Sequence, residues 1–129
     1  MDFLSSNSQI LMEKSLSFLW AKQAAILDNI ANAETPEYKA KVVTFEESVR
    51  TQLEEAASRP EGAGKAVRDI LRDSGFTVFE AQEETRMDDN GVNTTDQMVE
   101  MIRNAYQQQY VYQAINKHYS MLSKAVRGQ

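Results

Sequence analysis

Hydrophobic residues recur at helical spacing through the first part of the chain. The stripe consists of Met12, Leu16, Leu19, Ile26 and Ile30. Steps of three, four and seven residues predict an amphipathic helix from about residue 6 to residue 33. Gln23 occupies the position that the step of seven skips, so the stripe is heptad-like with one polar interruption. At 1.5 Å per residue, such a helix would be roughly 40 Å long.

A second stripe runs to the end of the chain and alternates steps of three and four without a break. It consists of Met98, Met101, Ala105, Gln108, Tyr112, Ile115, Tyr119, Leu122 and Val126. This spacing is typical of helices that pack against each other lengthwise. Thr94, followed three residues later by Gln97, predicts a capping box at the start of the helix. Gly128 predicts its end.

The middle of the chain has shorter and mixed patterns. Thr44 and Glu47 predict a capping box on a short acidic helix, and residues 65 to 73 predict one or two further helical turns. Residues 75 to 93 begin with strand character and contain Asn90-Gly91, a strong hairpin-turn signal. We therefore expect a small β-hairpin there.

Together these patterns predict a mainly α-helical protein. Two long N- and C-terminal amphipathic helices should pack as an antiparallel coiled-coil-like hairpin, with a small irregular or β-hairpin insert between them. The expected segments are the N-terminal helix in 1–35, an acidic middle segment with a short helix in 36–93, and the C-terminal helix in 94–129.

An antiparallel hairpin also predicts a register. Residue numbers that face each other should sum to about 127, which pairs Leu16 with Tyr112 and Ile26 with Met101. The full predicted seam consists of Leu16, Leu19, Ile26, Met98, Met101, Tyr112, Ile115, Tyr119, Leu122 and Val126.

Composition narrows the functions open to such a chain. A net charge of −5, from 14 basic and 19 acidic residues, argues against nucleic acid as a partner, because phosphate binding needs clustered Lys and Arg. With no cysteine and a single histidine, His118, the sequence offers no disulfide framework, thiolate metal site or catalytic triad. We expect no enzyme, no cofactor and no small-molecule substrate. Neither a bilayer-spanning apolar run nor a secretory signal is visible.

The junction after the first helix is the most specific feature of the sequence. Residues 29 to 40 read NIANAETPEYKA. Asn32 can end the helix in a left-handed conformation, and Pro36 cannot continue it. Thr35 precedes proline and is pushed toward an extended geometry. These effects explain a helix end, but they do not explain this particular string.

The string LDNIANAETPEYKA, residues 27 to 40, resembles the N-terminal signature of the bacterial flagellar axial proteins, the rod and hook group. In that signature an Asn-aliphatic-Ala-Asn core is followed by Thr-Pro-Gly-Tyr. The matching residues are Asn29, Ile30, Ala31, Asn32, Thr35, Pro36 and Tyr38. Glu37 stands where glycine is usual, at a position where glycine would allow a tight turn. The continuation YKAKVVTFEESV and the ending YQAINKHYSMLSKAVRGQ are similar to the proximal rod proteins of the B type.

This resemblance implies a structural subunit of the flagellar basal-body rod. Such a subunit would assemble through its terminal helices into the tubular drive shaft that transmits torque. The implied partners are copies of itself, other flagellar rod proteins, and the rod-base adaptor and export gate at the inner-membrane ring. The implied location is the periplasmic rod, reached by export without a cleaved signal peptide.

Within this reading, the seven matching residues form an assembly motif that ends the buried helix where the chain must turn outward. Two alternatives stay open. One is another short flagellar rod subunit. The other is a soluble helical adaptor or chaperone for flagellar export substrates, which would be a stable helical monomer or dimer in the cytoplasm.

Overall fold

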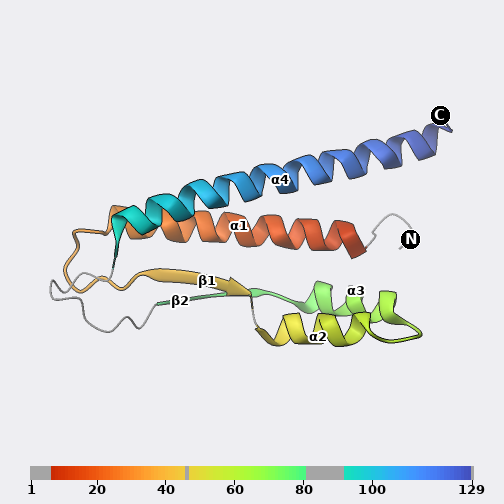
Figure 1. The fold of residues 1–129 in the computed structure, drawn as a ribbon, viewed down its shortest axis with the longest axis horizontal. Helices are drawn as coiled ribbons and strands as arrows, with labels where there is room; N and C mark the ends of the chain where they lie inside the picture. The colour runs from red at the N-terminus through yellow and green to blue at the C-terminus, as the bar shows by residue number, and fades with distance from the viewer. Residues whose placement is uncertain (1–6, 46, 81–91, 129) are drawn as a thin grey trace.

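The computed structural model describes residues 7–45, 47–80 and 92–128. Its elements, in chain order, are α1 (Asn7–Ala31), β1 (Lys41–Phe45), α2 (Glu47–Ala57), α3 (Ala63–Asp73), β2 (Phe76–Glu80) and α4 (Thr94–Arg127). Figure 1 shows α1 between α4 on one side and the strands and short helices on the other. The predicted mainly helical fold, with long terminal helices packed together, is confirmed.

The two long helices lie antiparallel in the predicted register. The Asn104 amide donates to the Gln23 side-chain oxygen at 2.8 Å, and the Gln108 amide donates to the Leu19 carbonyl at 3.3 Å. The residue numbers of both pairs sum to 127. Asn104 is fully buried in this interface, so the polar interruption at Gln23 has a polar partner on the facing helix. A buried asparagine between two helices favours one register over its neighbours, because any shift leaves its amide without partners.

The predicted seam on α4 divides into two groups. Met101, Ile115 and Leu122 are half-buried, as expected for the face that meets α1. The other seam residues of this helix are exposed in the single chain: Met98, Tyr112, Tyr119 and Val126. The hydroxyl groups of Tyr112 and Tyr119 accept hydrogen bonds from Trp20 and Gln9 of α1. Apolar partners for the exposed parts of these four side chains remain a prediction for an assembled state. The face toward α1 instead includes Asn104, a polar residue that hydrophobic spacing could not identify.

The strands form a two-stranded antiparallel ribbon in which Lys41 pairs with Glu80 and Phe45 with Phe76. The strand expected after residue 75 is present, but it pairs with a segment far earlier in the chain, and the predicted turn within residues 81–91 lies outside the described residues. Thr44 lies in β1 opposite Thr77, so the predicted capping role of Thr44 is wrong. Long-range strand pairing has replaced the local capping geometry, and α2 begins at Glu47.

The ends of α4 follow local rules. The Asn93 side chain accepts hydrogen bonds from the N–H groups of Thr95 (3.1 Å) and Asp96 (3.3 Å), so the predicted capping box on Thr94 is wrong by one residue. Asparagine is among the strongest N-cap residues, which explains why it takes this position. At the other end, Gly128 is left-handed, with φ 69, and its N–H group bonds the Lys124 carbonyl, as predicted.

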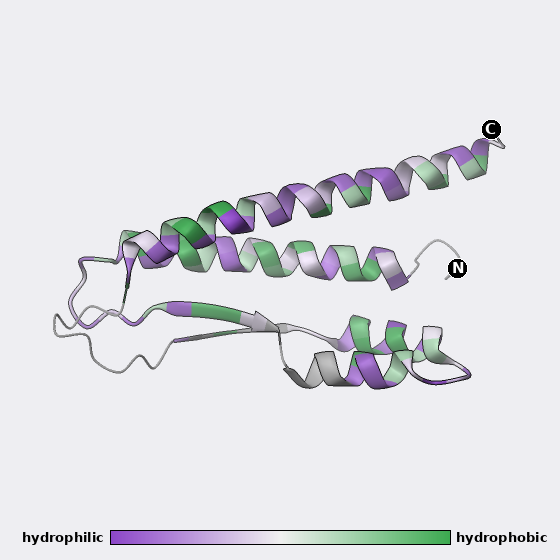
Figure 2. Ribbon diagram, viewed as in Figure 1, coloured by the Kyte–Doolittle hydropathy of each residue, from purple (hydrophilic) through white to green (hydrophobic). Residues whose placement is uncertain are grey.

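Buried hydrophobic side chains are few in this elongated arrangement. In the described part of the chain they are Ile10, Leu19, Ala25, Ile26, Ala40, Val43, Ala56, Leu71 and Val92. Figure 2 shows strongly hydrophobic residues of α4 gathered in its N-terminal half, beside the C-terminal half of α1. Several of them, including Val99 and Ile102, are more than half exposed. The single chain therefore leaves apolar surface uncovered on its longest helix.

Candidate functional site

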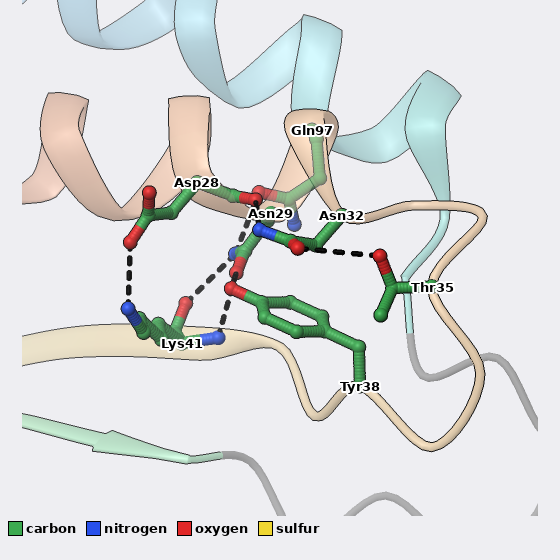
Figure 3. A network of polar contacts seen from close by, with 7 residues as sticks. All are labelled: Asp28, Asn29, Asn32, Thr35, Tyr38, Lys41 and Gln97. Atoms are coloured by element: carbon green, nitrogen blue, oxygen red, sulfur yellow. Dashed lines mark hydrogen bonds and ion pairs between the residues drawn. The ribbon is translucent and has the colours of Figure 1, made fainter.

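Asn29, the first residue of the predicted assembly motif, is buried, and its side chain uses all of its hydrogen-bonding capacity. Its side-chain oxygen accepts from the Lys41 N–H group at 2.7 Å and from the Tyr38 hydroxyl at 3.2 Å. Its amide nitrogen donates to the Lys41 carbonyl at 2.9 Å and to the Gln97 side-chain oxygen at 3.0 Å. The residue is 1% exposed. Figure 3 shows these groups converging on Asn29 from three segments of the chain.

The Asn29 side chain forms the same pair of hydrogen bonds with the backbone of β1 that a neighbouring strand would form. One donor and one acceptor on the same side chain satisfy both backbone groups of Lys41, which lies at the first position of the strand. The bond to Gln97 extends the connection to the first turns of α4. Asn29 therefore fixes the end of α1, the start of β1 and the start of α4 relative to one another.

Asn32 forms hydrogen bonds at the end of α1 while its own φ stays negative. Its N–H group bonds the Asp28 carbonyl at 3.0 Å, and its side-chain amide donates to the same carbonyl at 2.9 Å. Its side-chain oxygen accepts from the Thr35 hydroxyl at 3.2 Å. The predicted left-handed conformation of Asn32 is wrong, because Glu37 is the positive-φ residue other than glycine in the described chain, with φ 58.

Residues 35 to 38 form the turn that sends the chain back toward Asn29. The Tyr38 N–H group bonds the Thr35 carbonyl at 3.3 Å. Proline in the second position and a positive φ in the third are the marks of a type II turn, which favours glycine in the third position. Glu37 adopts that conformation, at a cost of roughly 1–2 kcal/mol for a residue with a Cβ. The turn places the Tyr38 hydroxyl on Asn29.

Two ion pairs flank this network. Lys41 Nζ lies 2.6 Å from Asp28 Oδ2, and this hydrogen bond raises the pKa of Lys41. Lys22 Nζ lies 2.8 Å from Glu100 Oε2 across the α1–α4 interface. The hydrogen bond from Lys22 lowers the pKa of Glu100, against the opposing effect of burial. The first pair tightens the junction, and the second joins the two long helices near it.

The seven motif residues thus have different environments. Asn29, Asn32, Thr35 and Tyr38 take part in one hydrogen-bonded network, which we call the junction network, together with Asp28, Lys41 and Gln97. Ile30 is half-buried, whereas Ala31 and Pro36 are exposed. Sequence reasoning missed Gln97, which it had assigned to a capping box. A hint was available, since three glutamines, Gln23, Gln97 and Gln108, lie on or beside otherwise apolar stripes.

The junction has the character of a structural joint. Within residues 7–45, 47–80 and 92–128, no three acidic or histidine side chains are grouped so that they could hold a metal ion. None of the helices described there combines the length and hydrophobicity needed to cross a bilayer. The polar groups of Asn29 are all engaged with the chain itself, which leaves them nothing to offer a ligand.

Comparison with known proteins finds one informative similarity. No family model matches the chain. The chain is 30% identical over 122 residues to FlgB, the flagellar basal body rod protein of Bacillus subtilis (strain 168). The match covers 91% of this chain and 91% of that protein. The similarity therefore extends along nearly the whole of both chains and is not confined to one motif.

Proposed function

Because this chain belongs to the FlgB family of flagellar basal body rod proteins, we propose that it is a structural subunit of the proximal rod. The observation that carries this function is the similarity along 91% of both chains. Two long terminal helices that bracket a small insert suit a subunit of an elongated assembly. The fold is thus consistent with the family.

We propose that assembly proceeds through the terminal helices. Met98, Ile102, Tyr106 and Tyr110 follow one another at steps of four along α4, and all are exposed in the single chain. Residues four apart share one side of a helix, and the last two of this row, Tyr106 and Tyr110, line the edge of the α1–α4 contact beside Phe18 of α1. Exposed apolar rows of this length mark contact surfaces in soluble proteins. Copies of this chain and other flagellar rod proteins are the partners that the family indicates.

The assembly motif, in this proposal, acts inside the subunit. The junction network holds α1, β1 and α4 together, and so sets the geometry in which the long helices meet neighbouring subunits.

Further parts of the proposal concern the place of the protein in the cell. We propose that it contacts the rod-base adaptor and the export gate, lies in the periplasm, and is exported without a cleaved signal peptide. We also propose that it transmits torque and catalyses no reaction. The family assignment supports the proposed contacts, location, export and torque transmission. The proposal that the protein catalyses no reaction rests on its residue types, which include no cysteine and one histidine.

The test is to locate the protein in cells. An epitope-tagged chain should complement loss of the native protein in its own bacterium and copurify with isolated basal bodies. Asn29→Ala should reduce its incorporation, whereas Gln52→Ala, at an exposed position on α2, should not. A tagged protein that supports motility from the cytoplasm, as a stable monomer absent from basal bodies, would favour the export adaptor instead. Incorporation at a non-proximal position would favour another short rod subunit.

A further inference from the structure

An apolar groove runs along one side of the α1–α4 pair. Its volume is about 520 Å³. From α1 it is lined by Ser15, Phe18 and Leu19, and from α4 chiefly by Tyr106 and Tyr110. Both tyrosines are at least 70% exposed, so the groove is open to a partner.

The opposite side of the same helix pair carries a projecting tryptophan. Trp20 is 60% exposed, and its indole N–H group donates to the Tyr112 hydroxyl at 3.2 Å. Trp20 lies two residues after Phe18, and Tyr112 lies two residues after Tyr110. Two residues correspond to about 200° around a helix of 3.6 residues per turn. The Trp20–Tyr112 pair therefore lies on the far side of the hairpin from the groove, at the same level along it.

We propose that the groove of one subunit receives Trp20 of a second copy of this chain. This proposal rests on the proposed function and names the contact through which it would act. A tryptophan buries roughly 150–250 Å² when covered, and aromatic groups favour edge-to-face or offset contact with rings such as those of Phe18 and Tyr110. The bond to Tyr112 holds the indole in place before binding, which reduces the entropy lost on association.

The placement of the two features determines the kind of assembly. Because tryptophan and groove lie on opposite sides, Trp20 cannot fill the groove of its own chain. A two-fold dimer that filled both grooves would need both features on one side. Each copy instead offers its tryptophan to one neighbour and its groove to another. Such a heterologous contact produces a ring or an open helical array. A second copy is thus the occupant for which this chain carries both complementary surfaces.

The chain itself provides the probe, because Trp20 is its one tryptophan. As the concentration of purified full-length protein rises, sedimentation should show oligomers, and the emission of Trp20 should shift to shorter wavelength with reduced quenching by acrylamide. Trp20→Ala and Tyr110→Glu should each raise the concentration for half-assembly at least about tenfold. Gln109→Glu, with the same added charge on the neighbouring exposed position, should leave it unchanged.

Mixing the two defective variants tests the direction of the contact. Trp20→Ala keeps an intact groove and Tyr110→Glu keeps an intact tryptophan, so an equimolar mixture should form dimers but no larger species. Oligomers of the native chain in which Trp20 stays accessible to acrylamide would overturn this contact while leaving self-assembly standing. A native chain that stays monomeric would also overturn it. Absence of the protein from basal bodies would instead overturn the rod assignment.

Discussion

Replacing Asn29 with alanine should destabilise the isolated subunit more than any other single change in the predicted assembly motif. The substitution removes four hydrogen bonds of 2.7 to 3.2 Å from a residue that is 1% exposed. It leaves both backbone groups of Lys41, the Tyr38 hydroxyl and the Gln97 side chain without their partner. A buried polar group that loses its partner costs about 1–3 kcal/mol.

The net effect is smaller than the sum of those costs. Lys41, Tyr38 and Gln97 are half-buried, so water can replace part of what is lost. Alanine also favours the helix over asparagine by roughly 0.5 kcal/mol. We therefore expect a loss of about 2–3 kcal/mol in the free energy of unfolding. Asn29→Asp should not rescue it, because a carboxylate cannot donate to the Lys41 carbonyl or to Gln97.

The assay is urea unfolding followed by circular dichroism, at a concentration where the chain is monomeric. Asn32→Ala is the matched control. Asn32 lies three residues on, and its side-chain bonds are at an exposed helix end, so its loss should cost about 1 kcal/mol or less. If Asn29→Ala changed the free energy of unfolding by no more than Asn32→Ala, the junction network would not hold the three segments together as argued.

Three further predictions follow from the junction and the helix interface. Glu37→Gly should raise the free energy of unfolding by about 1 kcal/mol, because glycine adopts a positive φ without strain; an unchanged melting temperature would contradict a strained turn. Pro36→Ala should weaken assembly more than it changes the helicity of the monomer, and normal assembly of purified variant would dismiss a role for the proline. Folding lowers the pKa of Glu100. The ion pair with Lys22 therefore stabilises the folded chain at pH values above the pKa that Glu100 has in the unfolded chain, and this stabilisation is lost as the pH falls through the pKa that Glu100 has in the folded chain. On acidification below about pH 5, the free energy of unfolding should therefore fall less for Lys22→Met than for the native chain. If urea unfolding at a series of pH values showed the same fall for both proteins, the ion pair would make no contribution to stability.

The sequence by itself determined the two long helices and the register in which they run antiparallel. Apolar periodicity and helix-ending residues are local signals, and a chain that places two such stripes at its ends has few ways to bury them. That is why the apolar pattern alone predicts the antiparallel register, with facing residue numbers that sum to 127. The helix stop before Pro36 was equally local. The same reasoning identified the motif residues, but not what most of them contact.

Only the tertiary structure decided the partners of those residues. Asn29 bonds Gln97, which is 68 positions away, and β1 pairs with a strand separated from it by two helices. A polar side chain does not reveal from its own sequence neighbourhood which distant group will satisfy it, because several donors and acceptors of the same type compete. Likewise, the stripe on α4 could not show which apolar residues face α1 and which stay exposed. Two overlapping sets of positions on α4 fit the same 3.5-residue period: the apolar stripe, and a set shifted toward Asn104. The buried Asn104, which bonds Leu19 and Gln23, shows that the second set faces α1.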